Sequence, residues 1–346
     1  MRPANREEIA QWDEFVVRNP DGGHILQTRA WGEFKRQHGW SPLYLRTDGN
    51  GRDLSVLVLQ RSFAGLGNLW YVPKGPGVAE ATQLREIVTS FRRDTPPFAV
   101  KIEPELVDAA GTQTCLRELG LVKARHDVQI SRATIVVDIR PDEESLLASF
   151  KPKTRYNIRL AGRHGVEVAP VALTDDNVDT MFALMAATQS RAGFTLRSKP
   201  YFAGYWRLHE AAGQGRLFFA MWQGKVLAGV FATFLGRKAW YKDGGSVKEH
   251  AEVMAPHLLQ WEVMRWLRGR GVESYDLVAV PPQALLTPEH PLYGLYRFKS
   301  GFSDTVTEFV GTWDLPVHRA RYQLWDRILE RAAHQWSYRV RHDLFY

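Results

Sequence analysis

The chain is poor in cysteine and has no long apolar run. Its single cysteine, Cys115, cannot form an internal disulfide or a thiolate-rich zinc site. No stretch approaches the ~20 apolar residues that span a bilayer, and residues 1–8 lack the apolar core of a signal peptide. The expected location is therefore the reducing cytoplasm.

Several motifs of catalytic sites are also missing. The histidines are scattered, with no His-x-x-x-His pair on an expected helix, which gives no support to a metal site. The chain has no Gly-x-Ser-x-Gly elbow, no P-loop and no loop with the spacing used for acetyl-CoA. We therefore expect no metal or organic cofactor, and neither serine hydrolase chemistry nor ATP hydrolysis.

What the chain has is typical of a soluble globular protein. Its 346 residues are 45% hydrophobic and 24% charged, and this length predicts about two domains. The net charge of +7 is moderate, so its meaning depends on whether the basic residues cluster. The 12 tryptophans can pack a core or stack on sugars and bases, and composition does not choose between these uses.

The two halves share an order of expected elements. Strand-like segments 43–45, 54–59 and 68–72, with a turn at Asp48–Gly51, precede a helix over 79–92; segments 217–222, 226–235 and 238–242 precede a helix over 254–271. Leu69-Trp70-Tyr71 and Ala239-Trp240-Tyr241 occupy matching places. Such orders are common by themselves, but the self-similarity favours a duplicated α+β unit. At the C-terminal end, residues 317–336 are helical by pattern, with Leu324, Ile328 and Ala332 spaced by four.

A basic segment follows the expected join near residues 138–149. Lys151, Arg155, Arg159 and Arg163 are spaced by four, and Lys153 lies among them. If the segment after Pro152 is helical, the arginines share one edge while Ile158 and Ala161 face the core. No acidic residue between 145 and 166 relieves the repulsion, so a polyanion is a reasonable partner. The alternative is a solvated basic face.

Four segments, taken in order, resemble the Fem family of non-ribosomal peptidyl transferases, which add bridge amino acids to peptidoglycan precursors. They are Leu26–Lys35, Lys151–Arg159, Asp243–Ser246 with Tyr275-Asp276-Leu277, and Gly294–Phe302. Each motif alone is weak, but their order extends across nearly the whole chain.

The resemblance implies two tandem α+β domains like those of GCN5-type acetyltransferases. We expect residues 1–145 plus 317–346 to form the first, precursor-binding domain, and residues 146–316 to form the second, which binds tRNA and carries out catalysis. The chain shows no coiled-coil arm of the kind found in some members, so it is similar to the compact form.

The resemblance also implies roles for single residues. Lys35 looks like the lysine that contacts the nucleotide-sugar precursor, and Arg197 with Tyr201 resembles the pair that holds its phosphates. Tyr241 matches the first tyrosine of a Tyr-x-Tyr-Gly pattern, whose second position is Asp243 here. Glu103-Pro104 stands where the family has Asp-Pro. For each residue, the alternative is a surface or packing role.

Phe298-Lys299 resembles the pair tied to catalysis and to the tRNA acceptor end. Lys299 would supply positive charge to an oxyanion or a terminal phosphate, and Phe298 would stack on a base. An acceptor amine with a pKa near 10.4 must lose its proton, at a cost of roughly 4.6 kcal/mol at pH 7. Glu103 and Asp243 are candidate bases, and the substrate itself is a third candidate.

The expected activity is transfer of an amino acid from aminoacyl-tRNA to the third-residue side-chain amine of a stem peptide. The acceptor would be UDP-MurNAc-pentapeptide or lipid II, and the enzyme a monomer that contacts the inner face of the membrane peripherally. Two alternatives stay open: an acyltransferase of the same fold with another activated donor, and a tRNA-binding protein without catalysis.

Overall fold

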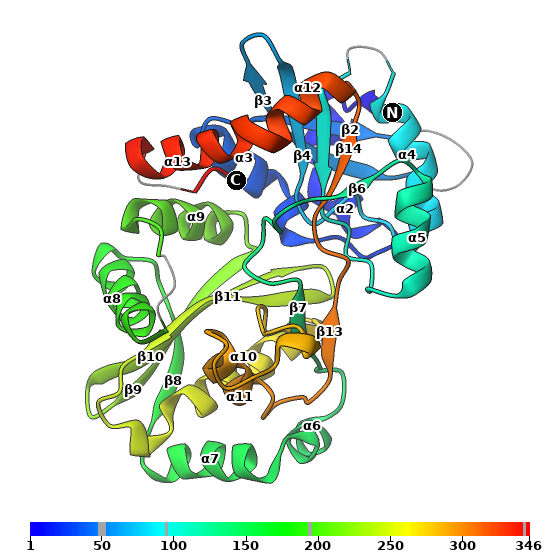
Figure 1. The fold of residues 1–346 in the computed structure, drawn as a ribbon. Coiled ribbons are helices and arrows are strands. Elements are labelled where there is room, and N and C mark those ends of the chain that lie inside the picture. The colour runs from blue at the N-terminus through cyan, green and yellow to red at the C-terminus, as the bar shows by residue number, and fades with distance from the viewer. Residues whose placement is uncertain (48–52, 94–95, 193–195, 342–343) are drawn as a thin grey trace. The chain divides into compact units, whose positions relative to one another are not determined.

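The protein divides into two compact units. The computed structural model describes residues 1–47, 53–93, 96–192, 196–341 and 344–346, so the expected turn at Asp48–Gly51 lies outside the described residues. Unit 1 comprises residues 1–132 and 308–346, and unit 2 comprises residues 133–307. Each unit is a mixed sheet flanked by helices (Figure 1).

Unit 1 is built on a seven-stranded sheet in the order β1-β2-β3-β4-β5-β14-β6. Its strands are β1 (Arg2–Pro3), β2 (Ser41–Arg46), β3 (Ser55–Phe63), β4 (Gly67–Val72), β5 (Ala99–Ile102), β6 (Val122–Lys123) and β14 (Trp313–Pro316). Its helices are α1 (Arg6–Ala10), α2 (Trp12–Val17), α3 (Arg29–Gln37), α4 (Leu84–Phe91), α5 (Ala110–Glu118), α12 (Arg319–Leu324) and α13 (Glu330–Arg341), with a π-helical turn, η5 (Trp325–Leu329), joining the last two. Short 3-10 turns lie at η1 (Ile25–Gln27) and η2 (Ala81–Gln83).

Unit 2 has a second seven-stranded sheet in the order β8-β9-β10-β11-β12-β7-β13. Its strands are β7 (Ala133–Asp138), β8 (Glu167–Val171), β9 (Gly215–Trp222), β10 (Lys225–Leu235), β11 (Lys238–Ser246), β12 (Ser274–Asp276) and, at the edge, β13 (Val306–Glu308). Its helices are α6 (Glu143–Ser149), α7 (Pro152–Arg163), α8 (Asp175–Ala192), α9 (Lys199–Ala211), α10 (Ala255–Arg268) and α11 (Tyr293–Lys299), with 3-10 turns η3 (Ala251–Val253) and η4 (Gln283–Leu285).

The two sheets share one plan, which confirms the duplication that the sequence predicts. In unit 1, β4 and β5 are parallel and their outer neighbours are antiparallel; in unit 2, β11 and β12 form the corresponding parallel pair. The chain therefore folds as two tandem α+β units, each built on a mixed sheet flanked by helices.

Two strands, β7 and β14, lie in the unit other than the one to which the expected boundaries assign them. β7 follows unit 1 in sequence but pairs with β12, whereas β14 follows unit 2 and pairs with β5 and β6. The unit boundaries at 132/133 and 307/308 therefore differ from the expected boundaries at 145/146 and 316/317. Local periodicity does not reveal this exchange, because it shows that a segment is a strand without naming its partner.

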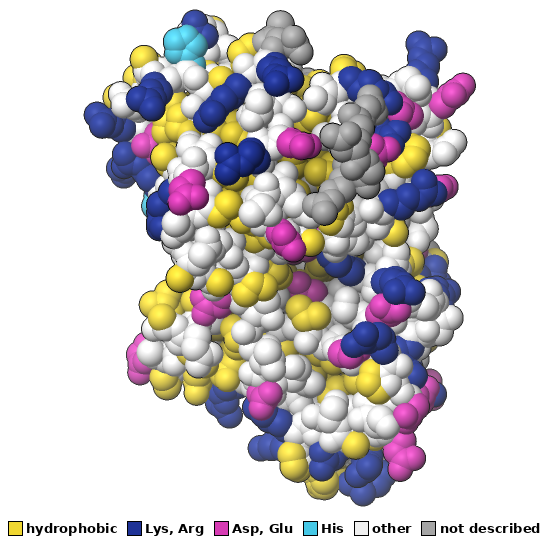
Figure 2. Space-filling view, turned by 90° about the vertical axis from the view of Figure 1, so that its right-hand side faces the viewer, with side chains coloured by type: hydrophobic (Ala, Val, Ile, Leu, Met, Phe, Trp, Pro, Cys, Tyr) yellow, Lys and Arg dark blue, Asp and Glu magenta, His cyan; other side chains and the backbone are white. Residues whose placement is uncertain are grey.

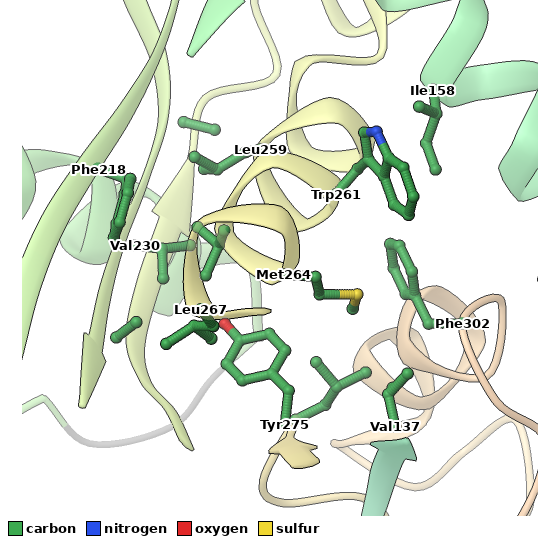
Figure 3. Close-up of a cluster of buried hydrophobic side chains, with 14 of the residues drawn as sticks. Val137, Ile158, Phe218, Val230, Leu259, Trp261, Met264, Leu267, Tyr275 and Phe302 are labelled. Carbon is green, nitrogen blue, oxygen red and sulfur yellow. The ribbon is translucent and has the colours of Figure 1, made fainter. Parts of the chain in front are cut away.

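The core of unit 2 forms around α10. Leu259, Met264 and Leu267 point from this helix into a buried cluster that includes Phe302 and Ile158 of α7 (Figure 3). The helix begins after Met254, which has a positive φ of 57°, and Pro256 in its first turn fits a helix start. Packing on both α7 and the segment after α11 lets α10 hold those two elements in place.

One face of the molecule shows how the charged side chains are distributed (Figure 2). On the face shown in Figure 2, basic and acidic side chains are interspersed, so the excess of seven positive charges forms no single continuous patch there. Among the residues that the structure describes, no helix has the length and apolar character needed to cross a bilayer.

Candidate functional site

Lys299 closes α11 and is held inside unit 2 by backbone carbonyl groups. Its Nζ donates hydrogen bonds to the carbonyl oxygens of Val278 (2.9 Å) and Ala279 (3.1 Å), and only 4% of the side chain is exposed. The Tyr241 ring centroid lies 5.7 Å from Nζ. Burial lowers the pKa of Lys299 to about 8, and the negative charge of Asp276 opposes this shift. The ammonium ion is thus buried among neutral acceptors.

The backbone at the end of β12 is shaped to receive that ammonium group. Val278 has a φ of 57°, which is unfavourable for a β-branched residue. Its own N–H donates to Asp276 Oδ1 at 2.6 Å, while its carbonyl accepts from Lys299. Asp276 also accepts from the Thr134 hydroxyl of β7. A strained turn held by Asp276 therefore directs a carbonyl towards Lys299.

α11 is fixed against the start of α7 by a close approach at Gly301. The Lys151 N–H donates to the Gly301 carbonyl at 3.0 Å, and a Cβ at Gly301 would overlap the Thr154 hydroxyl. Phe298 lies half-buried beside this contact, with its ring 5.1 Å from that of His257 and 5.4 Å from that of Phe302. Phe298 therefore packs on His257 and Phe302.

The basic segment does form the expected helix, α7, with Ile158 and Ala161 buried. Lys151, Lys153, Arg159 and Arg163 are exposed, and Arg163 lies over the Tyr156 ring at 5.7 Å. Arg155 differs from them. Its guanidinium donates to the carbonyls of Ala148 (3.0 Å) and Phe150 (2.5 Å), where α6 ends. Arg155 is therefore committed to a helix end, whereas the other four cations face solvent.

A bulge in β11 separates Tyr241 from Asp243. Asp243 pairs with Phe231 and Tyr241 pairs with Ala232, so Lys242 is the extra residue. The two side chains accordingly leave the sheet on opposite faces. Burial, followed by the nearby Asp243 charge, raises the pKa of Tyr241 to about 12, so this phenol stays protonated at neutral pH.

On its own face, Asp243 is held by α9. Trp206 Nε1 donates to its Oδ2 at 2.8 Å, and Lys242 Nζ donates to its Oδ1 at 3.2 Å. Near the start of the same helix, the Arg197 guanidinium lies 4.3 Å from the Tyr201 ring centroid. This cation–π contact holds the Arg197 guanidinium against the Tyr201 ring.

In unit 1, Lys35 lines a cavity of about 480 Å³. Its Nζ lies 5.0 Å from the Trp31 ring centroid, and the side chain is buried. Arg61 forms another wall: its guanidinium contacts the rings of Trp40 (4.3 Å to the centroid) and Phe345 (4.6 Å). It also donates to the carbonyls of His38, Gly39 and Phe345, so it joins the end of α3 to the C-terminal segment.

Glu103 follows β5 and accepts hydrogen bonds from neutral groups. The donors are the Tyr71 hydroxyl (2.5 Å), the Thr312 hydroxyl (3.1 Å) and Gln129 Nε2 (3.3 Å). The carboxylate lines a small pocket that also includes Lys74. Both carboxylate oxygens of Glu103 therefore accept hydrogen bonds from neutral donors.

The structure thus gathers some predicted residues and leaves others apart. Lys299 lies near Tyr241, and Arg197 lies on Tyr201, but Asp243 is on the opposite face of the sheet from Tyr241. Sequence reasoning assigned no role to Val278, Asp276 or Arg61. The signal for Asp276 was present in the Tyr275-Asp276-Leu277 segment, whereas nothing local marks Val278 as a residue with positive φ.

A sequence profile of the FemAB family matches residues 119–212 and 219–329. The lipid II:glycine glycyltransferase of Staphylococcus aureus (strain MRSA252) is 25% identical over 407 aligned positions, which cover 93% of this chain and 94% of that protein. The protein of the same name from strain USA300 is equally similar.

Two solved structures share the fold. The crystal structure of FemX superposes with a TM-score of 0.81 at 20% identity, covering 94% of this chain and 100% of that chain. The C-terminal domain of a putative lysylphosphatidylglycerol synthetase from Agrobacterium fabrum gives a TM-score of 0.54 at 14% identity, covering 93% and 96% respectively.

Proposed function

Because the chain belongs to the FemAB family, we propose that it transfers an amino acid from an aminoacyl-tRNA to a peptidoglycan precursor. The acceptor is the side-chain amine of the third residue of the stem peptide, and the product carries the first residue of an interpeptide bridge. The name shared by the staphylococcal relatives, lipid II:glycine glycyltransferase, supports this reaction class.

The observation that carries the proposal is the environment of Lys299. Its ammonium group is buried, yet its hydrogen-bond partners, Val278 and Ala279, are neutral carbonyls. With a pKa of about 8, the group is mostly protonated at pH 7. A positive charge that no ion pair neutralises suits a site where negative charge develops during the reaction.

The chemistry needs little beyond alignment and charge. The acceptor amine nitrogen attacks the carbonyl carbon of the aminoacyl ester, and the resulting oxyanion accepts a hydrogen bond from Lys299. The bond to the terminal ribose oxygen then breaks, the amine loses a proton and the ribose hydroxyl gains one. Glu103 and Asp243 are both engaged by other groups, which favours proton transfer within the substrates themselves.

The precursor is held by the residues suited to phosphate groups. Lys35, which lines the cavity of unit 1, is a proposed phosphate contact of that unit. Arg197, whose guanidinium lies against the Tyr201 ring, is a proposed phosphate contact of unit 2. Glu103 in unit 1 and Tyr241 in unit 2 are proposed to contact polar groups of the precursor. A lipid-linked acceptor would also require contact with the membrane surface.

The donor tRNA is proposed to bind along α7. Lys151, Lys153, Arg159 and Arg163 are exposed on this helix, and Phe298 lies next to its buried face through His257 and Asn157. Arg155 contributes to the backbone position at the end of α6, because its guanidinium is occupied by carbonyls.

Mass spectrometry of the acceptor tests the reaction. UDP-MurNAc-pentapeptide or lipid II is incubated with the protein and a mixture of charged tRNAs, with uncharged tRNA as the control. A product heavier by one amino-acid residue, formed only with charged tRNA, supports the proposal and identifies the amino acid. Product with lipid II alone supports the chemistry and selects the lipid-linked acceptor.

Transfer to neither acceptor contradicts the proposal. Transfer from another activated acyl donor in the same assay would instead establish an acyltransferase of the same fold. Salt-sensitive tRNA binding without any transfer would establish a binding protein.

A further inference from the structure

The helices at the C-terminal end of unit 1 expose an unusual share of large apolar side chains. Of the eleven such side chains among the described residues, six lie between positions 324 and 344. Four of them, Leu324, Ile328, Trp336 and Val340, are between 45% and 59% exposed. They are spaced by multiples of four, with Ala332 completing the series, and we call them the apolar row.

This row is not the face that attaches the helices to unit 1. Trp325 makes that attachment, with its ring 4.6 Å from Phe63 and 5.8 Å from Phe98. Two acidic side chains also point inward: Asp326 meets Arg125 at 2.9 Å, and Glu330 meets the buried Lys101 at 3.3 Å. Trp325, Asp326 and Glu330 thus anchor the helices to unit 1, from positions outside the apolar row.

Arginines flank the apolar row on the outer surface. Arg327, Arg331 and Arg339 are exposed, each one position before a member of the row. Because the nearby acids Asp326 and Glu330 are engaged towards the interior, the outer surface of α12, η5 and α13 is positively charged. Positive charge and exposed apolar groups therefore share one side of a single helical segment.

We propose that this surface, the apolar row with its flanking arginines, binds the headgroup region of an anionic lipid bilayer. Helices that lie in a membrane interface combine Trp, Leu and Ile with Lys or Arg in this way. The arginines complement anionic phosphates, and the tryptophan suits the boundary between headgroups and acyl chains. A nucleic acid would use the arginines but offers nothing to Leu324, Ile328 or Val340.

The inference adds a location to the proposed function. A lipid-linked acceptor lies at a bilayer surface, so a peripheral attachment would raise its local concentration. The inference rests on the proposed function only for this purpose. Vesicle binding is measured without acceptor or tRNA, so loss of transfer and loss of membrane binding are separate results.

The test is co-sedimentation of the full chain with vesicles. Vesicles containing phosphatidylglycerol and phosphatidylcholine should pellet the protein, whereas vesicles of phosphatidylcholine alone should pellet much less. Added salt should weaken the binding without abolishing it, because salt screens the arginines and leaves the apolar contribution intact. Equal binding to both vesicle types, or to neither, would overturn the proposal.

Two double variants locate the surface. Ile328→Ser with Val340→Ser should lower the vesicle partition coefficient about tenfold or more, because exposed apolar side chains no longer enter the interface. Arg327→Gln with Arg339→Gln should lower it to a similar extent at low salt and less at high salt. All four side chains are exposed, so the circular dichroism spectrum and thermal midpoint should stay unchanged.

Matched controls make equivalent changes elsewhere. Ile130→Ser with Leu285→Ser removes two exposed apolar side chains, and Arg18→Gln with Arg237→Gln removes two exposed charges. Vesicle binding should be unchanged in both. If the controls weaken binding as much as the surface variants, the surface is misassigned. If the surface variants reduce tRNA affinity or abolish a dimer while vesicle binding persists, the occupant is RNA or a second copy and the proposal is wrong.

Discussion

Two buried lysines, Lys101 in unit 1 and Lys299 in unit 2, have opposite surroundings. In unit 1, Lys101 lies on β5 and pairs with Asp314 at 2.8 Å and Glu330 at 3.3 Å. Burial alone would lower the pKa of Lys101, but the two carboxylates outweigh it and raise the pKa. In unit 2, Lys299 lies against the end of β12, the strand corresponding to β5, and meets neutral carbonyls.

The difference shows how one fold can use the same residue type in two ways. The charge of Lys101 is balanced within the unit, so it is unavailable to a ligand and serves the structure. The charge of Lys299 is not balanced in this way, so the fold tolerates a destabilised ammonium that a reacting oxyanion would stabilise. Glu103, which follows β5, is an acidic residue among neutral hydrogen-bond donors. It is thus the converse of Lys299, a basic residue among neutral acceptors.

The largest expected effect on stability comes from removing Lys101. Lys101→Met leaves Asp314 and Glu330 buried without their cation, which should destabilise the protein by about 3–5 kcal/mol. Urea unfolding at neutral pH measures this loss. The kinetics of transfer, assayed where the variant is still folded, should change little. A Lys101→Met protein of normal stability would show that the ion pairs are not structural.

Removing Lys299 should affect transfer more than folding. Lys299→Ala should reduce kcat by about 10²–10³, the range seen when one oxyanion donor is removed, while precursor binding persists. Lys299→Arg keeps a charge and should retain part of the activity. Lys225→Ala, which removes an exposed lysine paired with Glu249, is the control and should behave as wild type. Normal turnover of Lys299→Ala would remove the catalytic role.

The pH dependence sharpens the same comparison. Because the folded pKa of Lys299 is depressed to about 8 from 10.5, the folded state releases this proton before the unfolded state does. Stability should therefore rise as pH increases from about 8 to 10.5, by up to about 3 kcal/mol, and this rise should be absent in Lys299→Met. For Lys101 the raised pKa has the opposite sign: its contribution is complete below the unfolded pKa and is lost as pH rises through the folded pKa.

Disrupting the close approach of Gly301 to Thr154, which positions α11, should have an intermediate effect on stability and kcat. Gly301→Ala places a Cβ against the Thr154 hydroxyl and should cost about 1–3 kcal/mol in stability, together with a drop in kcat. Gly294→Ala, within α11 and facing open space, is the matched control and should be neutral or slightly stabilising. Adding Thr154→Ala to Gly301→Ala should restore much of the loss, and no such coupling would contradict the proposed clash.

The smallest effect is expected on the surface of α7. Arg159→Glu with Arg163→Glu should raise the KM for charged tRNA. The slope of log KM against log salt concentration should fall by about one for each lost phosphate contact. Steady-state kinetics over a range of salt concentrations would show this change. Arg237→Glu, an equally exposed change in unit 2, should leave the KM for tRNA unaltered. Unchanged tRNA kinetics in the α7 variant would place the donor elsewhere.

Much of the local structure was predictable because it follows periodicity. The strands around Leu69–Tyr71 and Ala239–Tyr241, the helix after Pro152 and the burial of Ile158 and Ala161 are all confirmed. The helical spacing of Leu324 and Ile328 is confirmed, but their face is exposed, which periodicity alone does not reveal.

The candidate site was less predictable because it depends on backbone detail. The bulge at Lys242 reverses the face on which Asp243 emerges, and the positive φ at Val278 directs a carbonyl at Lys299. Neither has a local sequence signal, since Val disfavours that conformation. Arg155 shares the spacing of Arg159 and Arg163, yet its guanidinium donates hydrogen bonds to backbone carbonyls at the end of α6.

The late position of β14 in the sequence affects how the protein is made. During synthesis, β2 to β5 emerge early, but β14, which lies between β5 and β6 in the finished sheet, emerges only after all of unit 2. Residues 1–312 are therefore synthesised before unit 1 can complete its sheet, and until then one edge of β5 lacks its partner strand. Unit 2 runs without interruption from residue 133 to residue 307, so all of its strands are synthesised before β14 and it can fold first.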